Sequence, residues 1–263
     1  MLRNKNPRIT HGTPGEWGGA LNMSDKTIKI EIAGIHYGNM IYVSGGTFKM
    51  GSDHFDWSMP IHDVTVDDFY ICEIQVTQEL WMAVMGSNPS ESKYGVGIGG
   101  KLPVNNVSWN EVVDVFLPAL NRLTGLKFRL PTEAEWEFAA RGGNKSRGYK
   151  YSGSNKLDNV AWYWKNSDNG TNPLHSVHPV AAKLPNELGI YDMSGNVCEW
   201  CQDFFEPSYP SEHLVNPTGP SSGNQRVFRG GSWQNQPVNL RVGHRCANPP
   251  DYRAAFIGVR VAI

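Results

Sequence analysis

The sequence predicts a single α+β domain with few helices and long loops. The chain has 263 residues, among them 28 glycines and 17 prolines. Such frequent Gly and Pro are typical of many turns and irregular connections. The helix patterns all lie before residue 143, and short strand patterns and loops make up the rest. Because strands and helices do not alternate along the chain, a parallel sheet of repeated β–α–β units is not expected.

Strand patterns come first in the chain. Apolar and polar residues alternate over 26–34 and again over 62–75, which predicts half-buried strands. Residues 40–50 predict two short strands joined by a Gly-Gly pair. Residues 128–130 predict one further short strand, just before a helix.

Three helices are expected, each beginning after a hydroxyl side chain. Thr77, Ser108 and Thr132 precede apolar residues at helical spacing, and each hydroxyl can accept a hydrogen bond from a free backbone N–H group. Glu111 follows Ser108 by three residues, which predicts a capping box there. The third helix should end at Gly142, because glycine readily ends a helix.

Domain organisation follows from the same patterns. No tandem repeat and no linker interrupts the chain, so one domain is expected over residues 38–263. Residues 1–37 are expected to form an N-terminal arm and the first strand.

Charge and hydropathy exclude two classes of partner. The net charge of −1 and the isoelectric point of about 6.7 provide no basic surface for a phosphate backbone, so nucleic-acid binding is not expected. No stretch approaches the roughly 20 apolar residues that span a bilayer. The first forty residues lack the apolar segment of a secretion signal. The location is left open between cytoplasmic, phage-borne and surface-displayed after another export route.

The four cysteines are expected to be buried thiols. They are scattered too widely for a disulfide framework, and only two of them form a C-x-x-C pair: Cys72, Cys198, Cys201 and Cys246. A metal site would need a second ligand pair, and a redox site would need a β–α–β context; neither pattern is present.

Several blocks, taken in order, resemble one known family. They are GGTFKMGS at 45–52, RLPTEAEWEFAARGG at 129–143, GIYDMSGNVCEW at 189–200, RVFRGGSW at 226–233 and IGVR at 257–260. Together they resemble the formylglycine-generating-enzyme (sulfatase-modifying factor) family, from about residue 38 to the C-terminus. The resemblance implies a C-type-lectin-like fold.

The same resemblance indicates that catalysis is lost. Enzymes of the family oxidise a substrate cysteine with two cysteines shortly after the GGS block and a bound copper ion, which soft thiolates suit. Here residues 233–245 contain no cysteine, and His244 cannot replace two thiolates. A non-catalytic protein without copper is therefore expected. A divergent oxidoreductase that uses other residues in the same cleft is the alternative from another functional class.

The C-terminal segment 233–257 resembles the variable region of proteins encoded by diversity-generating retroelements. Such systems mutate template adenines, mostly in Asn codons, and this chemistry cannot produce Lys, Gln, Glu, Met or Trp. None of these occupies the candidate ligand-binding slots, called the variable positions below: His244, Cys246, Ala247, Asn248, Pro249, Tyr252, Ala254, Ala255 and Phe256. Gln234 and Gln236 depart from the pattern, which leaves a generic non-catalytic binding module as the alternative.

A protein or cell-surface ligand of unknown identity is the expected partner, and the oligomeric state is left open. Tyr252 and Phe256 should supply most of the contact, because aromatic side chains give large contact area at low entropic cost. Arginines spaced through residues 232–263 are expected to form a fixed framework: Arg241, Arg245, Arg253 and Arg260.

A structural calcium site is also expected from the resemblance. Asp192 and Glu199 would supply carboxylate oxygens, and Gly195 and Val197 would supply backbone carbonyls. Calcium prefers such all-oxygen ligand sets.

Overall fold

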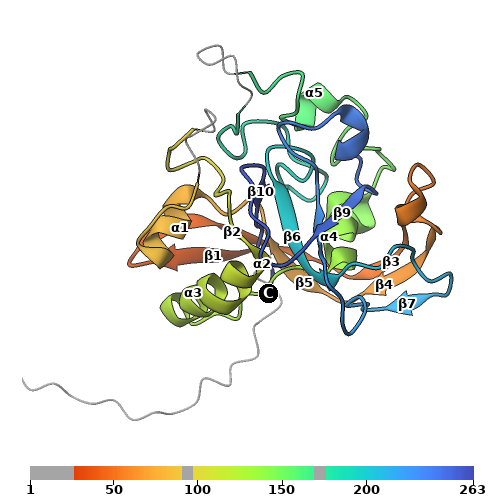
Figure 1. Cartoon of the computed structure of the whole chain (residues 1–263), viewed down its shortest axis with the longest axis horizontal. Helices are drawn as coiled ribbons and strands as arrows, with labels where there is room; N and C mark the ends of the chain where they lie inside the picture. Colours follow the sequence, from red (N-terminus) through yellow and green to blue (C-terminus); the bar gives the residue numbers. More distant parts are fainter. Residues whose placement is uncertain (1–26, 91–96, 169–175) are drawn as a thin grey trace, which may run out of the picture.

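The computed structural model describes residues 27–90, 97–168 and 176–263, so the predicted arm lies outside the described residues. Three small sheets and several short helices make up the fold (Figure 1). The first sheet has the strand order β1-β2-β5, with β1 (Thr27–Ile32), β2 (Ile35–Val43) and β5 (Phe69–Cys72). Both pairs in it are antiparallel.

The other two sheets lie on the opposite side and in the middle of the view in Figure 1. One has the order β3-β4-β7, from β3 (Gly46–Met50), β4 (His62–Val66) and β7 (Leu214–Val215). The other has the order β10-β6-β8-β9, from β10 (Ile257–Gly258), β6 (Cys198–Phe204), β8 (Arg226–Arg229) and β9 (Arg245–Asn248).

The predicted helices are present, and the hydroxyl caps are where they were expected. Thr77 precedes α1 (Gln78–Met85) and accepts a hydrogen bond from the Leu80 N–H group. Thr132 precedes α4 (Glu133–Ala140) and forms a full capping box with Glu135. The remaining helical segments are short: η1 (Asp56–Ser58), α2 (Trp109–Glu111), η2 (Val112–Phe116), α3 (Leu117–Thr124), η3 (Gly143–Lys145), α5 (Leu157–Val160) and η4 (Pro237–Leu240).

Two local predictions were wrong. Ser108 accepts a hydrogen bond from the Glu111 N–H group, but the Glu111 carboxylate pairs with Arg253 instead of completing a capping box. Residues 128–130 do not form a strand; Arg129 alone bridges to Ala262. At Glu111, a distant part of the chain takes the side chain that a local pattern had assigned to the helix start.

Two apolar cores hold the sheets together. Helices α1 and α3 cover the β1-β2-β5 sheet, where Trp81 stacks on Phe116 with ring centroids 4.4 Å apart. Helix α4 contacts β3, β4, β6 and β8 and closes the second core. Trp136 on this helix and Trp200 on β6 are fully buried, as large indole rings favour.

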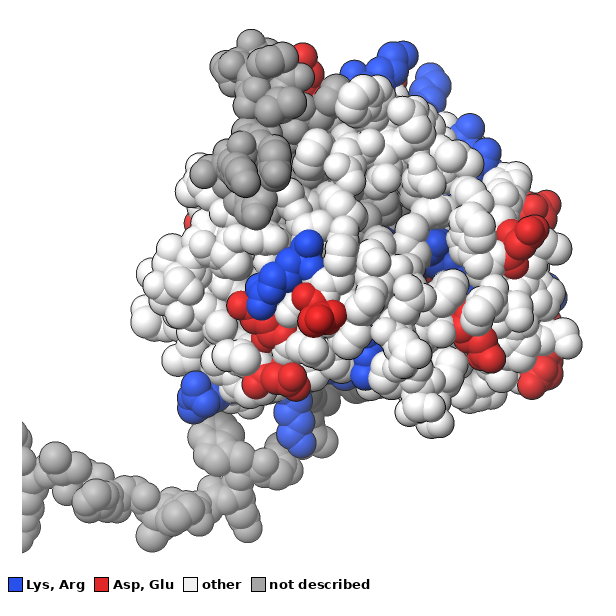
Figure 2. All heavy atoms as spheres, viewed as in Figure 1, with Lys and Arg blue, Asp and Glu red and all other residues white. Residues whose placement is uncertain are grey.

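The chain end runs along β5 and ties the domain together. Tyr70 donates to Ile263 O, and Cys72 donates to Val261 O. In the described part of the chain, no helix is long and apolar enough to cross a membrane. On the face shown in Figure 2, basic and acidic side chains are scattered among uncharged ones.

Candidate functional site

The candidate site is the outer part of the β10-β6-β8-β9 sheet and the segment that links β9 to β10. Strand β9 carries the first variable positions, and its register against β8 is set by Phe228 opposite Cys246 and Arg229 opposite Arg245. Neighbouring side chains on a strand point to opposite faces. Arg245 therefore points toward α4, while Cys246 points toward the first core and His244.

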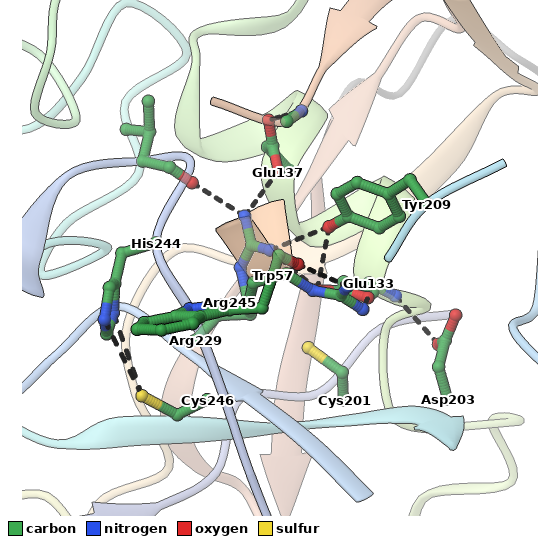
Figure 3. Close-up of polar contacts among 12 residues, drawn as sticks. Trp57, Glu133, Glu137, Cys201, Asp203, Tyr209, Arg229, His244, Arg245 and Cys246 are labelled. Atoms are coloured by element: carbon green, nitrogen blue, oxygen red, sulfur yellow. Dashed lines mark hydrogen bonds and ion pairs between the residues drawn. The ribbon is translucent and has the colours of Figure 1, made fainter. Parts of the chain in front are cut away.

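A buried ion-pair network anchors β8 and β9 to α4 (Figure 3). Arg229 Nη1 lies 2.7 Å from Glu133 Oε1, and Arg245 Nη2 lies 2.6 Å from Glu133 Oε2. Arg229 also pairs with Glu137. Burial alone would raise the pKa of Glu133, but the guanidinium groups of Arg245 and Arg229 outweigh burial and lower it. The network therefore holds an ionised carboxylate in the protein interior.

Arg245 also holds the loop that contains η1. Its Nη1 atom donates to Trp57 O at 2.9 Å and to Glu206 O at 3.0 Å. Phe55 stacks on Trp57, with ring centroids 5.2 Å apart, and meets the His244 ring edge-on at 4.7 Å. Trp57 is 41% exposed. The face beside His244 is therefore extended by two aromatic residues outside the C-terminal segment.

Sequence reasoning missed Phe55 and Trp57. The available signal was a pair of large aromatic residues within a short polar stretch, DHFDWS, where no strand or helix periodicity explains them. Their proximity to the C-terminal segment is a tertiary contact between residues almost 190 positions apart, so no local pattern shows it.

His244 is the least exposed of the variable positions. It is 4% exposed, and burial together with nearby Arg229 lowers its pKa to about 4. The imidazole ring is therefore neutral at pH 7. Its Nε2 atom lies 3.2 Å from Asn239 Nδ2. His244 thus influences the surface mainly through Phe55, which covers it.

The other variable positions reach the surface to different extents. Cys246, Ala247 and Asn248 are half-buried on β9, and Pro249 is exposed beyond it. In the link to β10, Tyr252 is 37% exposed. Phe256 is half-buried and packs against two apolar clusters, so it also supports the core.

Backbone hydrogen bonds to residues outside the variable positions hold this link in place. Asn106 N donates to Ala254 O at 3.0 Å, and Asn110 N donates to Pro250 O at 3.1 Å. Cys198 N donates to Phe256 O at 2.8 Å. Because a carbonyl accepts a hydrogen bond whatever its side chain is, the path of the link depends little on the residues it displays.

The framework arginines have unequal roles. Arg260 is fully buried, bonds to both oxygens of Glu199, and donates to Cys72 O at 2.7 Å. Arg253 forms a more exposed ion pair with Glu111. Arg241 is half-buried, and its Nε atom has no partner among the described residues. Arg245 and Arg260 are therefore the arginines that fix the two ends of the segment.

The cysteines are free thiols, and three of them are buried. Cys198 belongs to the first core and Cys201 to the second, so the C-x-x-C pair points to opposite faces of β6. Burial raises the pKa of both thiols well above its usual value. The pair is therefore not arranged for a shared metal or a disulfide, and the prediction of buried thiols is confirmed for Cys72, Cys198 and Cys201.

The residues that follow Ser232 form a hydrogen-bonded turn and pack in an apolar cluster. Asn235 Oδ1 accepts hydrogen bonds from Ser232 N at 2.9 Å and Ser232 Oγ at 2.8 Å. Leu240 is fully buried in an apolar cluster. Cys246 is the nearest cysteine downstream in the sequence, and burial raises the pKa of its thiol to about 11.

The residues predicted to hold calcium converge on the Gln75 side chain. Gln75 Nε2 lies 2.8 Å from Val197 O, 2.9 Å from Glu199 Oε1, 3.2 Å from Asp192 O and 3.4 Å from Gly195 O. A calcium ion binds oxygen at about 2.3–2.6 Å. It cannot reach these oxygens while the amide nitrogen lies among them, so the residues as arranged do not fit the ion.

Calcium would require the Gln75 amide to turn or to leave. Gln75 Oε1 and Asp192 Oδ1 are buried and have no partner among the described residues. Burial raises the pKa of Asp192 to about 6. The calcium site therefore stays a prediction that depends on movement of one side chain.

We expect the melting temperature of the protein to be the same in excess Ca²⁺ and in EGTA, because Gln75 already bonds to the carbonyl groups. The Gln75→Glu variant adds a buried carboxylate facing four oxygens. It should melt at a lower temperature in EGTA and recover in Ca²⁺, which supplies the missing positive charge. Differential scanning calorimetry measures both, and Gln75→Met is the control without a calcium response. A calcium-dependent melting temperature of the unmodified protein would contradict the account.

Comparison with known proteins shows which family the sequence matches. The model of the sulfatase-modifying factor enzyme 1-like domain matches residues 30–263. The chaperone protein LppX of Paenibacillus barcinonensis is 34% identical over 241 residues, which cover 74% of this chain and 78% of that protein. The formylglycine-generating enzyme of Streptomyces coelicolor is 36% identical over 196 residues, which cover 69% of this chain and 60% of the enzyme.

Solved structures show the same fold. Treponema denticola variable protein 1 superposes with a TM-score of 0.80 and 32% identity, covering 90% of this chain and 98% of that one. PvdO from Pseudomonas aeruginosa superposes with a TM-score of 0.69 and 27% identity, covering 86% and 94%. The predicted resemblance to a variable protein is confirmed at the level of the whole fold. The chain belongs to the family of sulfatase-modifying factor enzyme 1-like domains and has its α+β, C-type-lectin-like fold.

Proposed function

We propose that this protein is a non-catalytic ligand-binding protein, the variable protein of a diversity-generating retroelement. Its C-terminal face recognises a protein or cell-surface ligand through the variable positions. The observation that carries the proposal is the backbone support of the β9–β10 link, whose carbonyls bond to Asn106, Asn110 and Cys198. The similarity to Treponema denticola variable protein 1 supports the same reading.

Such a surface needs side chains that can change without loss of the fold. Two variable positions with polar side chains, Asn248 and Tyr252, make no side-chain hydrogen bond to another described residue, whereas the side chains of His244 and Cys246 contact each other. The charged groups that hold the segment are Arg245, between the variable positions His244 and Cys246, and Arg260, beyond the last variable position. The arrangement separates residues that hold the backbone from residues that face a ligand.

The chemistry of the thiols supports a role without catalysis. A thiolate is the nucleophile and the copper ligand in cysteine chemistry. No cysteine lies between residues 233 and 245, and burial raises the pKa of Cys246 to about 11. At neutral pH this thiol keeps its proton.

The DNA around the gene tests the proposal. We expect a reverse-transcriptase gene and a near-repeat of the coding sequence for residues 226–263 that differs from it at adenines. If neither is present, the retroelement assignment is wrong and a generic binding module remains.

For the enzymatic alternative, the purified protein is incubated with copper and a cysteine-containing peptide. Turnover to formylglycine would overturn the non-catalytic assignment.

The fold should tolerate exchange at the exposed variable positions. Tyr252→Ser and Pro249→Thr, both reachable by adenine changes in an Asn codon, are expected to shift the melting temperature by no more than about 2 °C. Ile257→Ser, at a fully buried neighbour, is the matched control and should lower it far more. Equal losses in all three variants would show that the link is core and not a display surface.

A further inference from the structure

One cavity lies apart from the variable positions. It has a volume of about 340 Å³ and lies between the N-terminus of α4, strand β4 and the segment 203–220. Its walls are mainly apolar and include Met50, Phe204, Leu214, Pro217 and Pro220. Of the C-terminal segment 233–257, only Arg245 reaches it. The volume falls within the range of small-ligand sites.

A buried carboxyl group lines this cavity. Asp203 is 3% exposed, and its Oδ2 atom accepts a hydrogen bond from Glu133 N at 2.8 Å, as Figure 3 shows. Among the described residues, no group donates a hydrogen bond to the other oxygen, Oδ1. Gly219 passes directly over it: a Cβ atom there would lie 3.2 Å from Oδ1 and 2.9 Å from the Asp203 Cβ atom.

The neighbouring cations are already engaged. Arg245 uses Nε and Nη2 for Glu133 and Nη1 for two carbonyls. Arg229 pairs with Glu133 and Glu137. Burial, and after it the Glu133 carboxylate, raises the pKa of Asp203 to about 8. The titratable and charged groups around it are Glu133 and Glu135 on α4, His62 on β4, Cys201 on β6, Arg226 on β8, Arg245 on β9, and Glu206 and Tyr209 on the segment 203–220.

We propose that this cavity binds a primary ammonium group carried on an apolar stem, with the ammonium on Asp203 Oδ1 and the stem against Phe204, Leu214 and the prolines. An ammonium offers three donors and the positive charge that this carboxylate lacks. The stem replaces water along the apolar walls. The ligand is thus an alkylamine or a lysine side chain.

The pH dependence of binding follows from linkage. The ammonium binds the ionised form of Asp203, so below pH 8 each binding event must release a proton from this carboxyl. Affinity should rise about ninefold from pH 6 to pH 7 and about fivefold from pH 7 to pH 8, and it should level off above pH 8, since an alkylamine stays charged to about pH 10. A ligand that accepts a hydrogen bond from the neutral acid would show the opposite trend.

The test is an NMR titration of the full chain with n-butylamine between pH 6 and pH 9. We expect roughly a fiftyfold gain in affinity from pH 6 to pH 8. The uncharged isostere n-butanol should bind far more weakly at every pH. Equal binding of the alcohol, or an affinity that does not rise with pH, would overturn the proposal.

Two variants locate the site. Asp203→Asn keeps an oxygen that can accept from Glu133 N but removes the charge, so it should abolish the pH-dependent binding. Glu206→Gln removes an exposed carboxylate from the rim of the same cavity and should bind as the unmodified protein does. If Glu206→Gln loses binding and Asp203→Asn keeps it, the assignment to Asp203 is wrong. The pH profile and the alcohol control need no variant.

Two further amines separate the sources of the ammonium. Nα-acetyl-lysine methylamide imitates a lysine within a protein, and 1,5-diaminopentane imitates a free diamine. Tighter binding of the first assigns the cavity to a protein partner, and tighter binding of the second assigns it to a small molecule. This site stands apart from the proposed ligand-binding face, so loss of either activity leaves the other measurable.

Discussion

The Arg260→Met variant is expected to lose about 3–5 kcal/mol of unfolding free energy, because it leaves the fully buried Glu199 carboxylate without its counter-charge. Arg260 bonds to both Glu199 oxygens at 2.8 and 2.9 Å, and it donates to two carbonyls at 2.7 Å. Trp136 and Gln75 also donate to Glu199. This carboxylate therefore joins β6, α4 and the chain end.

Urea unfolding followed by tryptophan fluorescence measures the loss. Arg253→Met is the matched control, because the Arg253–Glu111 pair is partly exposed and should contribute less than about 1 kcal/mol. The double variant Glu199→Gln/Arg260→Met removes both charges and should be more stable than Arg260→Met alone. A double variant that is less stable than the single one would show that the charge itself is not what the fold requires.

Replacement of Glu133 by glutamine should weaken the other buried network by a similar amount, about 3–5 kcal/mol. The change removes the carboxylate from Arg245, which then has no other acidic partner among the described residues. Arg229 keeps Glu137. The loss should concentrate at β9, so hydrogen exchange of the Arg245–Asn248 amides should accelerate more than that of β1.

The same variant should change the response to acid. The folded-state pKa of Glu133 lies below its usual value of about 4.3, so its contribution is present above that pH and is lost as pH falls through the folded pKa. The stability difference between the two proteins should therefore be full at pH 7 and shrink in acid. A difference that stays constant down to pH 2 would mean that Glu133 does not act through its charge.

The sequence by itself determined the local structure and the family. Thr77 and Thr132 predicted two helix starts correctly, since a cap depends on residues three or four positions apart. The blocks around RLPTEAEWEFAARGG and RGGSW identified the family and, with it, the fold. Loops have no hydrophobic periodicity, so only their particular residues can identify them. The absence of cysteine from residues 233–245 is likewise a fact of the sequence alone.

The tertiary structure decided what those residues contact. It placed Phe55 and Trp57 beside His244, and Gln75 among the oxygens predicted to hold calcium. It also left Asp203 without an ion-pair partner among the described residues, in a cavity with mainly apolar walls. Each of these contacts joins side chains that are brought together by packing of separate sheets and loops. Periodicity and spacing report only nearby residues, whereas the balance between burial and charge depends on partners far along the chain.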